Sequence, residues 1–514
     1  MLVRTFGSAV FGVEAISISV EVNVNEQGSN YFIVGLPDNA VKESLQRVES
    51  AVKSNHYYMP RTKLVVNLAP ADIKKTGSAF DLSIAIGTLG ATGQLPDPEL
   101  LTKYVIMGEL SLDGSLRPIR GALPIAIQAR RDGFEGLILP MANAREAAMV
   151  DGLCVYGVQH ISEVVDFFRG HTSLEPTIVN TQEEFSYTQG SFDVDFSDVK
   201  GQANIKRALE IAAAGSHNAI LIGPPGAGKT MLAKRLPTIL PPLTLAEALE
   251  TTKIHSVAGK LPEPATLVNK RPFRSPHHTI SDVALVGGGG NPQPGEISLA
   301  HHGVLFLDEL PEFKRAVLEV MRQPMEERKV TISRARIALD FPASFMLVAS
   351  MNPCPCGFFN HPEKECSCAP GVVEKYLNKI SGPLLDRIDL HVEVTPVPFD
   401  HLMENSDHET SEMIRERVIA ARLVQAERFR KHPGLYANAQ MGSQLLQEIC
   451  VLSSPGKQLL QMAMKRLNLS ARAYDRILKV SRTIADLAGS PEIQTEHLAE
   501  AIQYRSLDRE NWGK

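Results

Sequence analysis

The chain has 514 residues, with 53 Lys plus Arg against 58 Asp plus Glu, which gives a net charge of −5. This balance excludes a globally basic nucleic-acid coat protein, although a local basic surface remains possible because binding follows the distribution of charge. Six cysteines exclude a small disulfide scaffold. No apolar run approaches the ~18 residues of a transmembrane helix. We therefore expect a cytoplasmic protein of about three domains, with no membrane association.

The N-terminal part predicts a mixed α/β unit. Residues 16–24 alternate apolar and polar side chains, which is typical of a half-buried strand. Residues 63–68 and 104–107 predict buried strands, and helical patterns lie at 40–52 and 78–89. After this unit the apolar pattern fades into Thr, Ser, Glu, Gln and Pro, which is typical of a linker.

A phosphate-binding loop is predicted directly after the apolar run at 219–222. The segment fits G-x-x-x-x-G-K-[ST] and consists of Gly223, Pro224, Pro225, Gly226, Ala227, Gly228, Lys229 and Thr230. Glycines let backbone N–H groups approach phosphate oxygens closely, the lysine reaches the β- and γ-phosphates, and the threonine ligates Mg²⁺. The strand before it and the helical pattern after it disfavour a chance glycine-rich turn.

An acidic motif supplies the second half of such a site. The apolar run at 303–307 ends in Asp308 and Glu309. Asp308 is expected to hold Mg²⁺ together with Thr230, and Glu309 to orient or deprotonate the attacking water. Alone, this segment would be interpreted as a solvated acidic turn. Its pairing with the phosphate loop favours ATP hydrolysis.

Two further segments carry a resemblance to a known family. Residues 271–278 (RPFRSPHH), residues 384–389 (LLDRID) and the N-terminal region resemble the ComM/YifB family of magnesium-chelatase-like AAA+ ATPases. The resemblance covers nearly the whole chain and implies an α/β fold class, with ATP and Mg²⁺ as cofactors. It implies four parts: an N-terminal Lon-protease-like α/β domain (1–170), a linker (171–190), a P-loop AAA+ core with a parallel sheet (191–397) and a C-terminal, magnesium-chelatase-like helical lid (398–514).

The resemblance also implies roles for two polar residues beside the nucleotide. Asn352 follows the apolar run at 345–349 and resembles sensor 1, which positions the attacking water beside Glu309. Arg472 opens a helical segment of the lid and resembles sensor 2, which contacts the γ-phosphate. The alternatives are an Asn-Pro turn for Asn352 and a solvated helix face for Arg472.

Arg387 matches the arginine finger that these ATPases supply to a neighbouring subunit. A cation there stabilises the charge that develops on the transferred phosphoryl group. The alternative is a local ion pair with Asp386 or Asp389. A finger that acts on the neighbour implies a closed ring, for which we expect a homohexamer.

A candidate DNA contact lies between two β-type runs, at 329–333 and 337–339. They flank Arg334 and Arg336, in a place where the family resembles a presensor hairpin. Residues 251–294 form a second insertion, and both insertions point to the central pore in relatives. The two arginines are therefore expected to contact DNA phosphates without sequence preference. The alternative is a pair of solvated turn residues.

Four cysteines form two close pairs, Cys354 with Cys356 and Cys366 with Cys368. Four thiolates can surround one tetrahedral Zn²⁺, although C-x-C is less diagnostic than C-x₂-C. We expect a structural zinc that braces the loop after Asn352, with free thiols as the alternative. The paired histidines in 271–278 suggest metal or phosphate contact, but a polar loop is the simpler interpretation.

The N-terminal segments 77–82 and 119–123 resemble the Lon-protease-like fold. Ser78 stands where that family has its nucleophile, but the place of the general-base lysine is apolar, at about Leu123. Since a serine nucleophile requires a nearby base, we expect no proteolysis. Ser78 is expected to be a helix N-cap, and the domain to scaffold the ring or contact DNA.

The combined pattern predicts an ATP-dependent DNA motor. In the family that it resembles, a hexameric helicase of this kind promotes branch migration while incoming DNA is recombined during natural transformation. Single-stranded or branched DNA is the expected partner. The alternatives are a chelatase-type AAA+ remodeller of a protein complex and, less favoured because the lysine is missing, an ATP-dependent protease.

Overall fold

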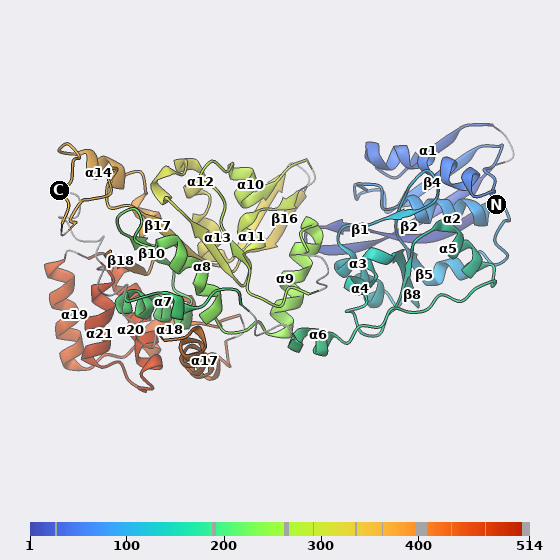
Figure 1. Ribbon diagram of the computed structural model, residues 1–514. Coiled ribbons are helices and arrows are strands. Elements are labelled where there is room, and N and C mark those ends of the chain that lie inside the picture. Colours follow the sequence, from blue (N-terminus) through green and yellow to red (C-terminus); the bar gives the residue numbers. More distant parts are fainter. Residues whose placement is uncertain are drawn as a thin grey trace.

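The computed structural model describes residues 1–505, except 26–27, 188–191, 262–266, 291, 335–336, 362, 397–408, 433 and 468. The molecule is elongated, with an N-terminal α/β unit at one end and the C-terminal helices at the other (Figure 1). A second α/β unit adjoins the first, and the C-terminal helices lie along one side of it (Figure 1). No helix in the described part of the chain is long and apolar enough to cross a membrane.

The N-terminal unit is built on a mixed seven-stranded sheet. Its strand order is β3-β4-β2-β1-β5-β8-β9. The strands are β1 Leu2–Phe11, β2 Glu14–Val24, β3 Tyr31–Val34, β4 Leu64–Ala69, β5 Tyr104–Ile106, β8 Gly136–Pro140 and β9 Cys154–Val158. The predicted strands at 16–24, 63–68 and 104–107 correspond to β2, β4 and β5. In β2 the alternation buries Ile18, Val20 and Val22 on one face, because successive side chains point to opposite faces of a sheet.

Helices cover this sheet, and a small hairpin lies beside it. The helices are α1 Asn39–Ser54, α2 Asp81–Ala91, η1 Leu100–Lys103, α3 Ala122–Arg131, α4 Met141–Ala147 and α5 Ile161–Phe168. The strands of the hairpin are β6 Glu109–Leu110 and β7 Leu116–Arg117. Every residue of α2 is buried, and apart from Asp81, which pairs with Arg47 at 2.6 Å, its side chains are apolar or small all round.

The predicted N-cap role of Ser78 is wrong. Helix α2 begins at Asp81, its N-cap is Phe80, and no side chain caps it. The Ser78 hydroxyl instead donates a hydrogen bond to the carboxylate of Glu109.

Segment 171–190, expected as a linker, contains the short helix α6 Thr181–Tyr187, whose Thr181 hydroxyl donates to the Met149 carbonyl at 3.3 Å.

The central unit is built on a five-stranded parallel sheet of order β11-β14-β17-β10-β18. Its strands are β10 Ala219–Ile222, β11 Phe273–Arg274, β14 Val304–Leu307, β17 Met346–Met351 and β18 Leu390–Glu393. Two antiparallel hairpins project from the unit: β12 Gly287–Gly288 with β13 Gln293–Pro294, and β15 Lys329–Arg334 with β16 Ile337–Pro342. The fold is therefore α/β with a parallel sheet, as predicted.

Helices surround this sheet. They are η2 Phe196–Asp198, α7 Ala203–Gly215, α8 Lys229–Ile239, α9 Leu245–Ala258, α10 Asp282–Val286, α11 Glu296–Leu299, η3 Leu310–Glu312, α12 Arg315–Glu319, α13 Arg322–Glu327, α14 Val372–Leu377 and α15 Gly382–Leu385. Helix α9 also contacts the N-terminal unit: the Gly121 N–H donates to the Ser256 carbonyl at 3.2 Å, and Ala248 packs in one apolar cluster with Leu123. The two α/β units are thus joined through a shared apolar core.

The C-terminal region is helical, as predicted. It consists of α17 Ser411–Arg428, η4 Asn438–Gln440, α18 Ser443–Ile449, α19 Ser454–Arg466, α20 Ala471–Leu487 and α21 Thr495–Gln503. The predicted helix at 471–487 coincides with α20, which Ser470 caps by accepting the Ala473 N–H. These helices pack against α7 in one core with the β10 side of the sheet (Figure 1).

Candidate nucleotide-binding site

The predicted phosphate loop connects β10 to α8 at the carboxyl edge of the parallel sheet. Strand β10 is fully buried, and α8 begins at Lys229. Gly226 and Gly228 have φ values of +78° and +84°, which residues with a Cβ rarely adopt. The helix N-terminus that follows the loop directs backbone N–H groups towards a bound anion.

Lys229 brings two predicted residues together. Its Nζ donates to the carbonyls of Gly223 and Pro224 at 2.7 and 2.9 Å, and to Oδ1 of Asn352 at 3.1 Å. Desolvation lowers the pKa of Lys229, although Asp308 and Glu309 oppose the shift. The amine is therefore held inside the loop, next to the residue expected to position water.

The magnesium ligands expected from the sequence are adjacent. The Thr230 hydroxyl donates to Oδ2 of Asp308 at 2.8 Å. These are oxygen donors, the ligand type that Mg²⁺ prefers, and the ion typically keeps several waters beside substrate phosphates. The Ser350 hydroxyl donates to the other oxygen of Asp308 and so fixes its orientation. The pair fits a nucleotide-bound Mg²⁺.

Glu309 lies beside this pair, at the start of the loop after β14. Its backbone is left-handed, with φ +54°, and its N–H donates to Oδ1 of Asp308 at 3.2 Å. The Glu309 side chain is 58 % exposed, and Nδ1 of His278 lies 3.7 Å from its carboxylate. An exposed carboxylate next to the phosphate loop is placed to receive a proton from water.

Two contacts of this site, from Ser350 and His278, were not assigned from the sequence. Both residues stand in motifs that the sequence does display, 350–353 and 271–278. Their partners are about 30 to 40 residues away, and only the order of the parallel strands brings them together. The sequence signal that could have identified these contacts is a polar residue at the end of each predicted strand.

Arg387 and Arg472 lie at the opposite edge of the sheet. Strand β18 pairs in parallel with β10, with Leu390 opposite Ala219, so Arg387 precedes the amino end of β18. Its carbonyl accepts from Asn218, just before β10, at 3.0 Å. Arg472 is 62 % exposed and pairs with Asp386 at 3.1 Å. Both arginines are therefore on the far side of the sheet from the phosphate loop of their own chain.

The alternative ion pairs of Arg387 with Asp386 or Asp389 are not formed. Its guanidinium pairs with Glu326 of α13, whose side chain is 58 % exposed. Asp386 binds Arg472, and Asp389 binds His217 at 3.0 Å. The Arg387 Nε has no hydrogen-bond partner among the described residues.

The four predicted cysteines converge. Cys354, Cys356, Cys366 and Cys368 have all their sulfur atoms within 4.8 Å of one another. This donor set fits one tetrahedral Zn²⁺ with all four positions filled by protein. The cluster also touches the phosphate loop, since a Cβ at Gly357 would lie 2.5 Å from Cδ of Pro225. The cysteine loop is thus packed against the nucleotide site and follows Asn352 directly.

The two arginines of the predicted DNA contact belong to a hairpin, and the tip of this hairpin is not among the described residues. Arg336 is not among the described residues, and only the backbone of Arg334 is, where it pairs with Ile337. The base of the hairpin is anchored: Phe341 is fully buried, and Lys329 pairs with Asp340 at 2.7 Å.

Comparison with known proteins agrees with this architecture. Family models described as magnesium chelatase, subunit ChlI; subunit ChlI of Mg-chelatase; and magnesium chelatase, subunit ChlI C-terminal match residues 195–402, 20–143 and 408–505. The chain is 44% identical to competence protein ComM of Haemophilus influenzae over 511 residues, which cover 99% of this chain and 98% of that protein. The chain belongs to the ComM/YifB family. YifB of Escherichia coli is 42% identical over 507 residues, covering 98% and 96% of the two chains. Membership of this magnesium-chelatase-like AAA+ family implies an ATPase.

A partial similarity extends to Lon proteases. Lon protease 2 of Bacillus subtilis is 32% identical over 154 residues, which cover 27% of this chain and 26% of that protein. In this ComM/YifB member Leu123, where a general-base lysine would be expected, is fully buried in α3. The Ser78 hydroxyl donates to the carboxylate of Glu109. A Ser–Lys nucleophile would instead require a lysine amine at this place.

Proposed function

We propose that this chain is an ATP-driven DNA motor that works as a ring. The observation that carries the proposal is the division of the ATPase centre between the two edges of the sheet. Lys229, Thr230, Asp308, Glu309 and Asn352 gather at the carboxyl edge. The cations expected to stabilise the transition state lie at the amino edge.

This division supports a site that is shared with a second subunit. A four-residue strand is ~13 Å long, and the sheet and its helices lie between the two sets of residues. Arg387 therefore cannot reach the phosphate loop of its own chain. Each chain would carry the phosphate loop on one side and the arginines on the other, so that neighbouring chains meet head to tail. Such an arrangement forms a closed ring when the rotation from one subunit to the next adds up to a full turn. We propose a homohexamer, with Arg387 as the finger and Arg472 as the sensor for the neighbour's γ-phosphate.

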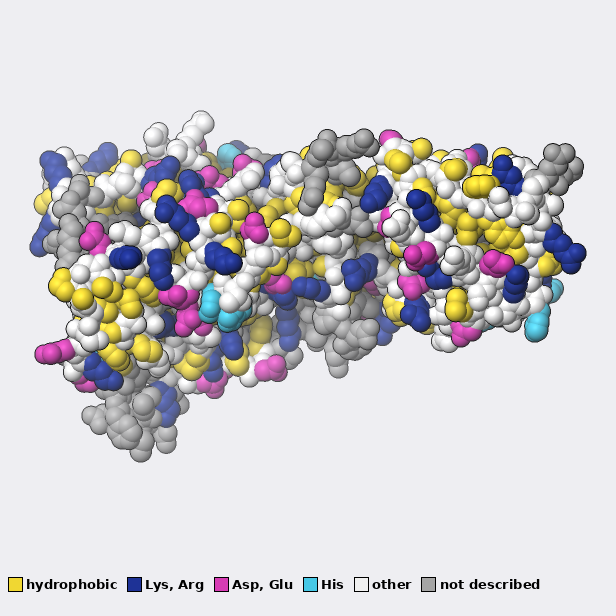
Figure 2. Space-filling view, turned by 90° about the horizontal axis from the view of Figure 1, so that it is seen from above, with side chains coloured by type: hydrophobic (Ala, Val, Ile, Leu, Met, Phe, Trp, Pro, Cys, Tyr) yellow, Lys and Arg dark blue, Asp and Glu magenta, His cyan; other side chains and the backbone are white. Residues whose placement is uncertain are grey.

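The substrate class is proposed from the full-length relative and the hairpin. The full-length relative of Haemophilus influenzae is named competence protein ComM. On the face in Figure 2 positive side chains are interspersed with acidic ones, so this face offers no broad basic surface for a DNA grip, and we assign the grip to the hairpin instead. We propose that hydrolysis drives helicase activity and branch migration on single-stranded or branched DNA during recombination of incoming DNA.

Replacing both Arg334 and Arg336 with alanine should weaken binding to DNA of any sequence. Each lost phosphate contact should lower the slope of log K against log salt by about one. Basal ATPase should survive, because the hairpin does not contribute to the nucleotide site. The measurement is fluorescence anisotropy with labelled forked DNA at several salt concentrations, together with strand displacement.

The matched control for that experiment replaces Arg130 and Arg131, an exposed pair on the N-terminal unit. It should bind and unwind DNA like the parent. A hairpin variant that behaves like the parent would contradict the pore assignment. A loss in the Arg130 and Arg131 variant instead would place the grip on the N-terminal unit.

Zinc should be present in the purified protein at about one ion per chain, because four thiolates close a tetrahedral site. Elemental analysis of protein prepared without chelator measures this directly. Since the cluster packs on Pro225, removing the metal should also lower ATP affinity. Protein that contains no zinc and has four freely titrating thiols would favour the alternative.

A chelatase-type remodeller remains the second candidate, because all three matching family models describe magnesium chelatase. The ATPase centre would be the same in both cases. The two functions differ in what stimulates hydrolysis: DNA in the first and a folded protein complex in the second.

A further inference from the structure

A sizeable cavity lies away from the nucleotide site. It has a volume of about 590 Å³ and lies between the central unit and the C-terminal helices. Asn218 and Asp389, at the amino ends of β10 and β18, line it, whereas no residue of the phosphate loop does. This size is typical of pockets that hold small organic ligands. The cavity therefore offers a second binding site at the opposite edge of the sheet.

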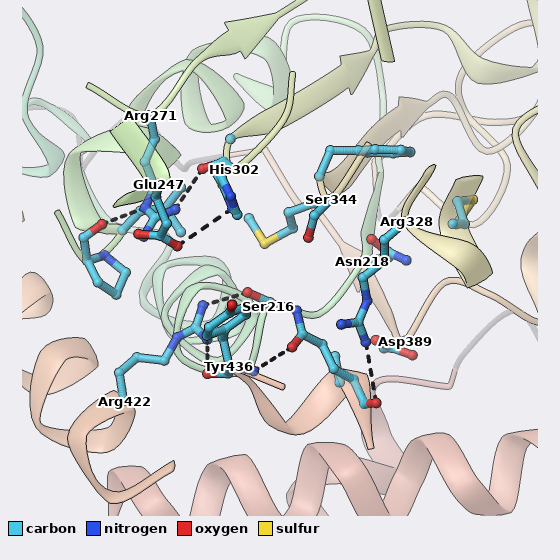
Figure 3. A pocket seen from close by; sticks show the side chains of 18 of the residues that line it. Ser216, Asn218, Glu247, Arg271, His302, Arg328, Ser344, Asp389, Arg422 and Tyr436 are labelled. Carbon is cyan, nitrogen blue, oxygen red and sulfur yellow. Dashed lines mark hydrogen bonds and ion pairs between the residues drawn. The ribbon is translucent and has the colours of Figure 1, made fainter. Parts of the chain in front are cut away.

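Among the charged side chains that line this cavity, cations outnumber carboxylates. Arg271, Arg328, Arg387, Arg422, Arg476 and Lys479 line it, against the carboxylates of Glu247, Glu326 and Asp389. In Figure 3 Arg422 enters from the helical side, Arg271 lies with Glu247 across from it, and Arg328 lies further along. Since desolvated charges are costly unless they are paired, a cavity with twice as many cations as anions calls for an anionic occupant.

Three of these cations have no carboxylate within ion-pair distance among the described residues: Arg328, Arg422 and Lys479. They are held by neutral oxygens alone. Arg328 donates to the Gly434 carbonyl at 3.0 Å, Arg422 to the Tyr436 carbonyl at 2.9 Å, and Lys479 to the Ala439 carbonyl at 3.1 Å. Neutral acceptors position the charged groups but provide no ion pair.

Two further observations on Arg422 and Lys479 support an anionic occupant of the cavity. Nε of Arg422 is buried and has no hydrogen-bond partner among the described residues. Desolvation, with the neighbouring Arg271, lowers the pKa of Arg422 to about 9, and desolvation with Arg476 lowers that of Lys479 to about 8. A bound anion would relieve both effects, because an opposite charge favours the protonated form.

We propose that this cavity binds a small organic polyphosphate of nucleotide size, at a site separate from the phosphate loop. Several cations from different directions suit an ion with more than one phosphate group. Apolar side chains such as Leu240, Phe345 and Met441 also line the cavity and would pack against an organic moiety. A cavity of about 590 Å³ between two layers of one chain matches a small molecule in size better than a DNA strand. Arg387 forms part of the wall, so the ligand would lie beside the proposed finger.

The test uses the full chain carrying Lys229→Ala, which removes phosphate binding at the ATP site of every subunit. Inorganic tripolyphosphate and ADP are titrated separately by isothermal titration calorimetry. At least one of the two should bind at one site per chain. Adding Lys479→Met or Arg328→Met should weaken that binding roughly tenfold or more, because each variant loses one charge-assisted contact. Binding by both probes would assign the affinity to phosphate alone, and binding by ADP only would add the organic group.

The matched control is Lys465→Met, the same change at an exposed residue of the adjacent helix α19. It should leave the affinity unchanged, and thermal unfolding without ligand verifies that each variant is folded. No binding of either probe at millimolar concentration would overturn the proposal, as would binding that both cavity variants leave intact. Weakened binding of single-stranded DNA in the same variants, with neither probe bound, would overturn it in favour of a DNA contact. None of these outcomes depends on the proposed motor function.

Discussion

Glu309→Gln should bind ATP as the parent does and hydrolyse it roughly 10²–10⁴ times more slowly, the usual contribution of a general base. The amide keeps the size of the side chain but cannot accept the proton of water. Thr230 and Asp308 remain to hold Mg²⁺, since their 2.8 Å contact does not involve Glu309. Steady-state phosphate release and binding of a fluorescent ATP analogue measure the two effects separately.

Lys229→Ala is the matched comparison for that experiment. It should lose nucleotide affinity itself, because the amine that contacts the β- and γ-phosphates is gone. The two variants therefore separate binding from hydrolysis. Near-normal hydrolysis by Glu309→Gln would exclude Glu309 as the base and direct attention to His278, 3.7 Å away.

Arg387→Ala should retain ATP and lose hydrolysis by about 10³–10⁵-fold, the range that arginine fingers contribute. The substitution also breaks the contact with Glu326, so Glu326→Gln is the control. That variant removes the ion pair but keeps the guanidinium, and it should hydrolyse ATP nearly as well as the parent. An inactive Glu326→Gln protein would assign the effect to the ion pair instead.

Mixing Arg387→Ala with Lys229→Ala protein should restore part of the activity. In a mixed ring, some interfaces combine an intact phosphate loop from one chain with an intact arginine from the next. Because the two groups lie at opposite edges of each sheet, neither variant alone can form such an interface. No recovery, in a mixture of labelled chains shown by fluorescence energy transfer to exchange subunits, would contradict the shared site.

Local patterns predicted much of the fold. Several elements lie where the sequence predicts them, because each is specified by consecutive residues. They are the phosphate loop with its strand β10, the apolar strand β14 that precedes the acidic motif, and helix α20. Ser78 shows the limit of that reasoning. A serine before a helical pattern predicts an N-cap, but the helix starts at Asp81, and Ser78 pairs with Glu109 on a different element.

Partners distant in sequence were the main features that could not be predicted. The Arg387 alternatives considered were its neighbours Asp386 and Asp389, yet the ion pair forms with Glu326, about 60 residues away. The contacts of Ser350 with Asp308 and of His278 with Glu309 likewise depend on strand order. The cavity lined by Arg328, Arg422 and Lys479 has no sequence signature, because its walls come from separate helices and loops.

The proposed motor requires that ATP hydrolysis by this chain is coupled to DNA. The most direct measurement is the ATPase rate with and without forked DNA, with displacement of a labelled strand followed in the same reaction and Glu309→Gln as the inactive reference. We expect that forked DNA stimulates hydrolysis and that the labelled strand is released only when ATP is hydrolysed. A hydrolysis rate that no DNA changes, with the strand left in place, would contradict it.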